Sequence, residues 1–486
     1  MKRPNIIIFN PDQFRADALG HLGNQASVTP NLDRVATEDG VSFRNAFCQN
    51  TVCTPSRCSF MSGWYTHVRG HRTMHHMMHE DEPVLLKTLK DEGYYVWWGG
   101  KNDLIPGQGS FEPYCNYKHR SKKPTNNLHK NDEWRGSPDG DNYYSFYAGN
   151  VTPKDGTEYH DGDWENVLAA ADFIKNAPSD QPFCIYLPLS YPHPPYGVEE
   201  PWYSMIDREK IQKRIPTPEG WNGKPSLLKG IWERQNLQGW TEDRWSELRA
   251  VYLGMCSRID HHFGLVVNAL KEADLYDDTS IFVFSDHGDF TGDYGLVEKT
   301  QNTFEDCLSN VPFIIKPPAW VKTQPGIRDA LVELVDFPAT VEALTGIQPK
   351  HTHFGKSLMP VIERNQDEHR DAVFCEGGRL QEERHCTEAE STSSLNPEGL
   401  YWPRVNLQQG EGPEHTKAVM VRTKDFKYVR RLYESDELYD LKNDPEELYN
   451  LIEDKKYGDI LLGLKERLLT FYQETCDVVP HKTDSR

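Results

Sequence analysis

Four side chains at two distant points of the sequence have the types that bind a cation. Asp12 and Gln13 come shortly after the apolar run 6–9, and Asp286 and His287 after the apolar run 281–284. The carboxyl ends of strands in an open parallel sheet share one edge, so these side chains can converge, although singly the aspartates would be turn or capping residues. Carboxylate and amide oxygens suit Ca²⁺, our first expectation, or Mg²⁺, while the imidazole leaves Mn²⁺ or Zn²⁺ open.

A cysteine motif lies between these two points. Cys53 begins the sequence Cys-Thr-Pro-Ser-Arg, which ends at Arg57 and continues into the small-residue stretch 58–63. A lone cysteine is usually a structural thiol, but this motif resembles the signature of type I sulfatases, members of the alkaline-phosphatase-like superfamily. The resemblance implies that a formylglycine-generating maturation enzyme oxidises Cys53, whose hydrated aldehyde is then nucleophile and metal ligand. Arg57 resembles the arginine that holds the formylglycine.

Two lysines and a histidine extend the resemblance. Lys101, in a Gly-Lys pair after the predicted strand 94–98, and Lys299, in Glu-Lys-Thr-Gln-Asn, match lysines that contact sulfate in the family. His193 follows the predicted strand 183–187 and matches a histidine near the sulfate. Either lysine alone would be an ordinary surface charge. Together they suit a sulfate ester, because cations neutralise the oxygens that repel a nucleophile.

Two residues depart from the family pattern. Gln13 stands where many sulfatases have a second aspartate, and Asp103 stands where the family has a histidine two residues after the lysine. The combination of Asp-Gln with Asp-His also resembles phosphonate monoester hydrolases and choline sulfatases. A phosphonate monoester or phosphodiester hydrolase with the same nucleophile is therefore an alternative. A catalytically inactive binding protein on this fold is a second one.

The resemblance implies a double-displacement mechanism. One hydroxyl of the hydrated formylglycine attacks sulfur, activated by the metal and Asp286. The alcohol leaves with a proton from His193, our first candidate for the acid, or from His287, our second. The other hydroxyl then loses its proton, with Asp103 as a candidate base, and departure of sulfate regenerates the aldehyde.

The composition bounds the partners and the location. A net charge of −20 argues against nucleic acid, and no apolar run approaches the length of a membrane span. The apolar run 6–9 is too short for a signal peptide, and the ten scattered cysteines suit a reducing compartment. We therefore expect a cytoplasmic protein. If a signal peptide was removed, we expect a periplasmic or secreted one. The 12 tryptophans and 23 tyrosines suit stacking on sugar rings, which favours a sulfated saccharide substrate. The oligomeric state, the sugar and its sulfate position stay open.

Apolar β-branched runs alternate with helical stretches, which predicts an α/β fold: a large, mostly parallel sheet between helices, with a smaller C-terminal antiparallel sheet and helix. A charged stretch at 363–369 places the boundary between a catalytic domain, 1–365, and a C-terminal subdomain, 366–486. The irregular stretches 106–157 and 199–240 predict long loops, either lids over the substrate or surface insertions. The histidine-rich stretch 67–79 lacks a defined metal-ligand spacing, and we interpret it as bordering the cleft.

Overall fold

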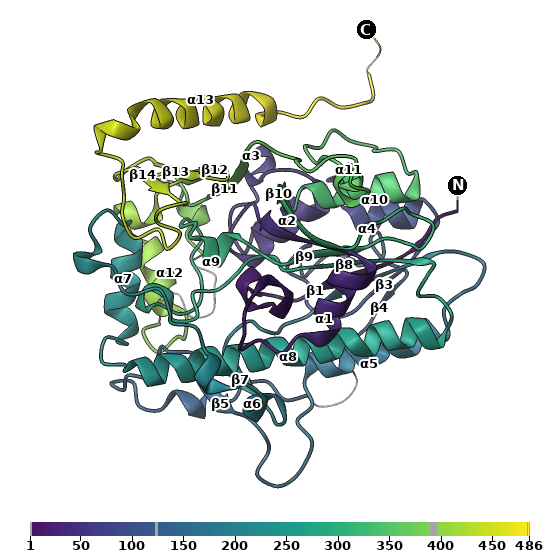
Figure 1. Ribbon diagram of the computed structural model, residues 1–486, viewed down its shortest axis with the longest axis horizontal. Coiled ribbons are helices and arrows are strands. Elements are labelled where there is room, and N and C mark those ends of the chain that lie inside the picture. The colour runs from purple at the N-terminus through teal and green to yellow at the C-terminus, as the bar shows by residue number, and fades with distance from the viewer. Residues whose placement is uncertain (1, 122–124, 389–395, 484, 486) are drawn as a thin grey trace.

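An eight-stranded sheet lies at the centre of the molecule (Figure 1). The computed structural model describes residues 2–121, 125–388, 396–483 and 485. The strand order is β10-β2-β9-β8-β1-β6-β3-β4, and only β9 runs antiparallel to its neighbours in this sheet. The strands are β1 (Asn5–Asn10), β2 (Val41–Phe47), β3 (Tyr95–Trp98), β4 (Tyr117–Lys118), β6 (Phe183–Pro188), β8 (Thr279–Phe284), β9 (Phe313–Lys316) and β10 (Gly326–Glu333).

Helices cover both faces of this sheet, which explains why its central strands carry apolar side chains on both faces, as in the runs 6–9 and 281–284. Along β1, Ile6 and Ile8 pack into one core cluster, and Ile7 and Phe9 pack into another on the opposite face. The first cluster includes side chains of α2 (Cys53–Ser62), α4 (Leu85–Asp91), α10 (Asp336–Thr345) and α11 (Met359–Ile362), and the second includes those of α1 (Pro30–Arg34), α5 (Gly162–Lys175) and α8 (Glu242–Glu272). The two layers lie on opposite sides of the sheet in Figure 1.

A second, antiparallel sheet follows in the C-terminal part of the chain, so the predicted fold class is confirmed. Its strands, in spatial order, are β11 (Val373–Gly377), β12 (Ala418–Arg422), β13 (Phe426–Arg431) and β14 (Glu437–Asp440). Helix α13 (Gly458–Thr475) packs on it, with the rings of Phe374 and Phe471 stacked at 3.9 Å between centroids. The proposed division between residues 365 and 366 stays a prediction; the second sheet begins at Val373.

The remaining regular elements lie in the loops. A small parallel pair is formed by β5 (Tyr147–Asn150) and β7 (Tyr196–Val198). The short helices are α3 (Thr66–Arg69), α6 (Trp202–Met205), α7 (Ser226–Gln235), α9 (Asp306–Ser309) and α12 (Trp402–Gln408). No helix within the described ranges is long and apolar enough to cross a membrane.

One expectation about the loops was wrong in part, and one long helix was not anticipated. The stretch 199–240 contains α6 and α7, whose residues Leu227, Leu228 and Ile231 are buried, so it is not wholly irregular. The 31-residue helix α8, which the sequence analysis did not anticipate, follows directly. Its buried charged residues, Arg258 and Asp260, interrupt the apolar stripe by which amphipathic helices are recognised.

Candidate active site

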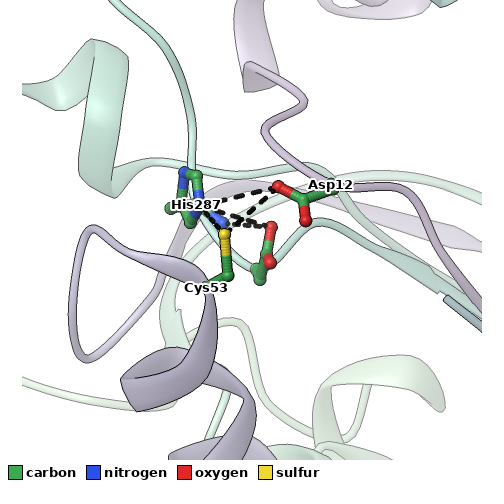
Figure 2. A group of neighbouring side chains, drawn as sticks. Asp12, Cys53 and His287 are labelled. Carbon is green, nitrogen blue, oxygen red and sulfur yellow. Dashed lines mark hydrogen bonds and ion pairs between the residues drawn. The ribbon is translucent and has the colours of Figure 1, made fainter. Parts of the chain in front are cut away.

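Four predicted residues meet at the carboxyl-terminal edge of the large sheet. The ligand atoms of Asp12, Cys53, Asp286 and His287 all lie within 4.8 Å of one another, and all four residues are buried. The Cys53 Sγ lies 3.2 Å from His287 Nε2 and 3.5 Å from Asp12 Oδ1. Figure 2 shows the side chains of Asp12, Cys53 and His287 pointing toward one another. The expected convergence of the two strand ends with the cysteine motif is therefore present in the structure.

Neighbouring strands bring these residues together. Strands β1 and β8 are parallel neighbours in register, so the chain leaves both at the same edge. The loops are then tied to each other, since Phe14 N donates to Ser285 Oγ (2.7 Å). Ser56 Oγ donates to Asp286 O (2.6 Å), which fixes the first turn of α2 against the end of β8. Cys53 is the first residue of α2, where the helix dipole favours an anion.

The donor set fits a divalent cation, with one mismatch. Ligands at about 2.3–2.6 Å from Ca²⁺ can lie up to about 5 Å apart across the ion, which accommodates the observed cluster. His287 Nδ1 lies 2.9 Å from Gly288 O, which only accepts, so Nδ1 carries the proton and the lone pair of Nε2 faces the cluster. The mismatch is Cys53, because a thiol is a poor ligand for a hard cation.

Gln13 lies in the site, but its side chain joins two other residues. Its Nε2 donates to Asp289 Oδ2 (2.5 Å), and its Oε1 accepts from Lys299 Nζ (2.6 Å). A metal-ligand role for Gln13 therefore stays a prediction. Burial raises the pKa of Asp289 to about 6 despite its hydrogen bonds from Thr291, Tyr196 and Gln13. The sequence analysis gave Asp289 no role of its own, although its position two residues after His287 was a signal.

Arg57 lies behind the two aspartates and is fully buried. Its Nε donates to Asp286 Oδ2 (2.9 Å) and its Nη2 to Asp12 Oδ2 (3.0 Å). Burial alone would raise the pKa of Asp12, but the neighbouring positive charges, Lys101 first among them, hold it well below its usual value. Both carboxylates are thus oriented by one guanidinium.

The two predicted lysines lie on either side of this cluster. Lys101 Nζ contacts Asp12 Oδ2 at 2.5 Å and Asp103 Oδ2 at 2.9 Å. Lys299 Nζ contacts Gln13 Oε1 at 2.6 Å and His193 Nε2 at 2.9 Å. Both charges also act on Cys53, whose thiol pKa is nonetheless raised, chiefly by burial and then by Asp12. The encoded thiol is therefore neutral.

The loop that carries Lys101 requires a glycine before it. Gly100 has a φ of 94°, and a Cβ at this position would lie 2.0 Å from Pro188 O at the end of β6. Three other residues of the site, Gln13, Asp103 and Glu298, have left-handed backbone conformations, with φ of 67°, 39° and 70°. Such conformations are unfavourable for residues with a Cβ and concentrate at functional sites.

His193 is held as a neutral acceptor. Its Nδ1 lies 2.6 Å from Pro194 O and therefore donates, which leaves Nε2 to accept from Lys299. Burial and the charge of Lys299 together place its pKa well below the usual value. The turn is fixed from α5, where the carboxylate of Asp163 accepts from Ser190 N and Tyr191 N at 2.8 Å each.

Asp103 contacts Lys101 rather than the nucleophile. Burial would raise its pKa, but Lys101 and Arg57 outweigh burial and lower it. Within the described residues, no hydrogen bond or ion pair joins Asp103 to Cys53. Its role as a base stays a prediction, and its geometry is that of a residue that orients Lys101.

The histidine-rich stretch lies beside the nucleophile helix. Thr54 Oγ1, one residue after Cys53, donates to Met74 O (3.3 Å). His71 is buried, with Nδ1 at 2.9 Å from His76 O and Nε2 at 3.3 Å from Glu82 Oε1. These contacts are structural, and His75 is exposed. The contact between Thr54 and Met74 agrees with the predicted position of the stretch 67–79 next to the site. A contact between its histidines and the substrate stays a prediction.

The comparison with known families agrees with this geometry. The family model of the sulfatases matches residues 4–347, and the model described as "N-sulphoglucosamine sulphohydrolase, C-terminal" matches residues 411–474. The chain belongs to the sulfatase family. As the sequence analysis predicted, this sulfatase is an enzyme, a hydrolase with the alkaline-phosphatase-like fold.

Relatives and solved structures span nearly the whole chain. The sulfatase is 26% identical to an arylsulfatase of Clostridium perfringens (strain 13 / Type A), over 96% of this chain and 94% of that protein. It is similar in fold to the phosphonate monoester hydrolase of Agrobacterium radiobacter, with a TM-score of 0.74 at 21% identity over 99% and 100% of the two chains. BT4656, solved in complex with its substrate D-glucosamine-2-N,6-O-disulfate, has a TM-score of 0.72 at 19% identity, over 99% and 100%.

Proposed function

We propose that this sulfatase removes sulfate from a sulfated carbohydrate, with a formylglycine made from Cys53 as nucleophile and one divalent cation as cofactor. The observation that carries the proposal is the convergence of Cys53, three candidate metal ligands and three cationic side chains at one sheet edge. The cations are Arg57, Lys101 and Lys299, and the candidate ligands are Asp12, Asp286 and His287, with Gln13 beside them. An anionic ester needs this combination of neutralising charge and positioned nucleophile.

The donor set favours an oxygen nucleophile at position 53. The Sγ of Cys53 lies where a hydrated aldehyde would present its hydroxyl groups to Asp12 and His287. Two hydroxyl oxygens would remove the mismatch between a thiol and a hard cation. Cys53 is 1% exposed in a helix that is buried at every residue, so a maturation enzyme would have to act before the chain folds.

Asp12, Asp286, His287 and the modified Cys53 would hold the metal, with Gln13 as the fifth candidate. Two carboxylates favour Ca²⁺, with Mg²⁺ as an alternative, and the imidazole keeps Mn²⁺ as a further one. When bound, the cation would supply Lewis-acid stabilisation of the charge on the sulfate oxygens and on the nucleophile.

The protein side chains would orient the ester. The charges of Lys101 and Lys299 both act on Cys53, and the two lysines would donate to the sulfate oxygens, while Arg57 stays buried against the carboxylates. His193 Nε2 lies 2.9 Å from Lys299 Nζ, so it would face the sulfate ester that Lys299 binds. A bound anion would raise the pKa of His193, which equips it to protonate the departing alcohol. His287, the second candidate for this acid, is turned toward the metal ligands instead.

Two likenesses support a carbohydrate as the alcohol. The model matched by residues 411–474 is named for an N-sulphoglucosamine sulphohydrolase, and BT4656 was solved with a sulfated glucosamine. The second candidate function is hydrolysis of phosphonate monoesters or phosphodiesters. The specific observation in its favour is Gln13 in place of a second aspartate, together with the similarity to a phosphonate monoester hydrolase.

Parallel kinetics would test the proposal. The protein would be produced with an active maturation system, and mass spectrometry of the peptide around Cys53 would establish conversion. We expect kcat/KM to be higher for sulfate esters than for a phosphodiester and a phosphonate monoester with the same alcohol. A sulfate ester that is the poorest substrate by orders of magnitude would select the second function. An unmodified, fully active thiol would refute the formylglycine.

Metal dependence has a readout that does not require activity. Addition of Ca²⁺, Mg²⁺ or Mn²⁺ to chelator-treated protein should raise Tm, since a ligand that binds only the folded state stabilises it. We expect the largest increase with Ca²⁺. Replacement of Asp286 by Asn should reduce this increase, and an identical response of the variant would argue against the metal site.

A further inference from the structure

Two aromatic side chains from different loops lie beside His193, the proposed acid. The ring of His129 lies 6.0 Å, between centroids, from that of His193, the proposed acid. The ring of Tyr401, directly before α12, lies 6.3 Å from His129 in a nearly parallel orientation (23°) and 6.5 Å from His193. His129 is exposed and Tyr401 is half-buried, so both rings retain free surface beside the site.

Tyr401 is fixed in place from both sides. Its ring packs against that of Phe146 at 5.3 Å, next to β5. Three residues later in the chain, Arg404 Nε contacts Glu298 Oε2 at 3.0 Å, and Glu298 directly precedes Lys299. The segment that carries Tyr401 is thus tied to the segment that carries the sulfate-contacting lysine. Among the described residues, no hydrogen bond is formed by the Tyr401 hydroxyl.

A recess begins between Lys101, His193 and His129. Its volume is about 260 Å³, slightly below the range of about 300–1,000 Å³ that drug-sized ligands occupy. Its inner wall is buried and includes Tyr159, Tyr191 and the amino-terminal end of α5, whereas its rim at Asn126 and Asn127 is exposed. The recess is lined by amide, hydroxyl and aromatic side chains together, which suits a hydroxylated ring.

We propose that His129 and Tyr401 form a ring-binding wall that contacts the alcohol half of the ester, and that this alcohol is a single pyranose ring whose hydroxyl groups face Asn126 and Asn127. The alcohol oxygen must lie near His193 to receive its proton, so the carbon skeleton extends past the two rings. Aromatic faces bind the flat, apolar face of a sugar, and the side-chain amides hydrogen-bond its hydroxyl groups. This inference rests on the proposed sulfatase function.

Ratios of kcat/KM on different sulfate esters would test the wall. The probes are a panel of monosulfated hexoses and hexosamines, phenyl sulfate, and butyl sulfate, which has no ring. Tyr401→Ala and His129→Ala should each lower kcat/KM for the best sugar sulfate about 5- to 10-fold, an effect of the size of one aromatic contact. The same variants should change kcat/KM for butyl sulfate less than about 2-fold, because the groups that bind sulfate are unaltered.

Three further variants separate a contact with substrate from a structural effect. Tyr401→Phe should retain the wild-type ratio, since the ring is kept. Asn127 Oδ1 accepts from His129 N at 2.9 Å, so the variant is Asn127→Ser, which keeps an oxygen that can accept this bond and removes the amide donor. It should reduce kcat/KM for the sugar sulfate several-fold and leave phenyl sulfate unchanged, because only the sugar has hydroxyl groups to bind. Tyr433→Ala, which removes an exposed tyrosine of the C-terminal subdomain, is the matched control and should change no ratio.

The outcomes distinguish the two proposals. If the converted wild-type enzyme cleaves none of the sulfates, the proposed function is wrong. If it cleaves phenyl sulfate but no member of the sugar panel, the pyranose is wrong. If the alanine variants lose activity equally on the sugar sulfate and on butyl sulfate, the rings are structural and the wall is refuted.

Discussion

Two buried clusters of charge in this protein are built differently. The first is the catalytic centre around Asp12, Cys53 and Asp286. The second, which we call the junction, joins the large sheet to the C-terminal sheet and α13; it consists of His67, Glu333, Asp336, Arg370 and Glu376. Both clusters are almost inaccessible to solvent, so burial alone does not separate a functional cluster from a structural one.

The junction satisfies its own charges. Arg370 donates to both oxygens of Asp336, contacts Glu333 Oε2 at 3.0 Å and also donates to the carbonyl of Phe354. The other oxygen of Glu333 accepts from Phe374 N in β11 at 2.7 Å. None of the five junction residues has a left-handed backbone conformation. These features are those of a site that holds two parts of a fold together.

The charged side chains of the catalytic centre are less fully paired with one another than those of the junction. The shortest contacts of Lys299 are with neutral groups, the amide of Gln13 and the imidazole of His193, and its ion pair with Glu298 is longer, at 3.2 Å. A thiol occupies the centre of a carboxylate cluster, and three backbone positions are strained. The centre therefore becomes complementary only when a cation and an anionic substrate are added. This difference predicts that substitutions in the centre remove activity, whereas those in the junction remove stability.

Replacement of Cys53 should have the largest effect. Cys53→Ala removes the proposed nucleophile, so kcat/KM should fall by at least about 10⁴-fold, as for other nucleophile knockouts. Tm should change by only a few degrees, because the thiol makes no strong bond in the fold. Steady-state kinetics and calorimetry would measure the two quantities. Cys476→Ala, at the exposed cysteine, is the control. Residual activity within 100-fold of wild type would contradict the assignment.

Arg370→Met should have the opposite signature. The variant leaves Asp336 and Glu333 buried without their cation, which should lower the free energy of unfolding by about 3–5 kcal/mol. At temperatures where the variant is folded, kcat/KM should stay within about 2-fold of wild type, since no junction residue contacts the site. Urea unfolding and kinetics would measure this. Arg430→Met, at a half-exposed arginine of the C-terminal sheet, should be nearly neutral. A large loss of activity in folded Arg370→Met would remove the distinction between the clusters.

Lys299→Ala tests the centre at a residue that does not hold the nucleophile. Loss of one preorganised donor to a developing charge typically lowers kcat about 10²- to 10³-fold. The effect should appear in kcat as well as in KM, because Lys299 also contacts His193. Lys322→Ala, at an exposed lysine, is the matched control. If only KM changed, Lys299 would bind the substrate without assisting the reaction.

The chemistry of the centre could be predicted from sequence because its residues follow strands or belong to a motif. Asp12 and Asp286 follow two strands whose apolar sequences are unmistakable, and parallel pairing alone brings the strand ends together. Cys53 and Arg57 lie on one helix, so their relative position is local. The main elements of the fold were predictable for the same reason, since strands buried on both faces are continuously apolar.

Contacts that depend on loop conformation were not predictable. The side chain of Gln13 turns to Lys299 because its backbone is left-handed and Asp289 accepts from its amide, neither of which has a sequence signal. His129 and Tyr401 are separated by 272 positions in the sequence. Their rings lie close together because two long loops approach each other in the fold. Helix α8 was missed because its buried Arg258 pairs with Asp161 and Glu199 of distant segments, and these pairings make a charge compatible with the core.

The smallest expected effect is the pH dependence of the junction. His67 Nδ1 lies 2.8 Å from Glu376 Oε1, and its Nε2 lies 3.0 Å from Thr475 O at the end of α13. Burial would lower the pKa of His67, but Glu376 outweighs burial and raises it. The pKa of Glu376 is lowered, since His67 outweighs its burial.

The raised pKa of His67 means that its stabilisation is fully present below its unfolded-state pKa of about 6.5, and is lost as the pH rises through the folded-state value. Glu376 acts in the opposite sense, with stabilisation present above about 4.5 and lost as the pH falls. His67→Gln should therefore destabilise the protein more at pH 5.5 than at pH 9, by about 1 kcal/mol, the size of one hydrogen bond. Urea unfolding of both proteins at the two pH values would measure the difference, with the exposed His481→Gln as control. If the difference in the free energy of unfolding between the two proteins were equal at both pH values, His67 would hold α13 by packing alone. The stability of the junction would then come from Arg370 rather than from a titrating pair.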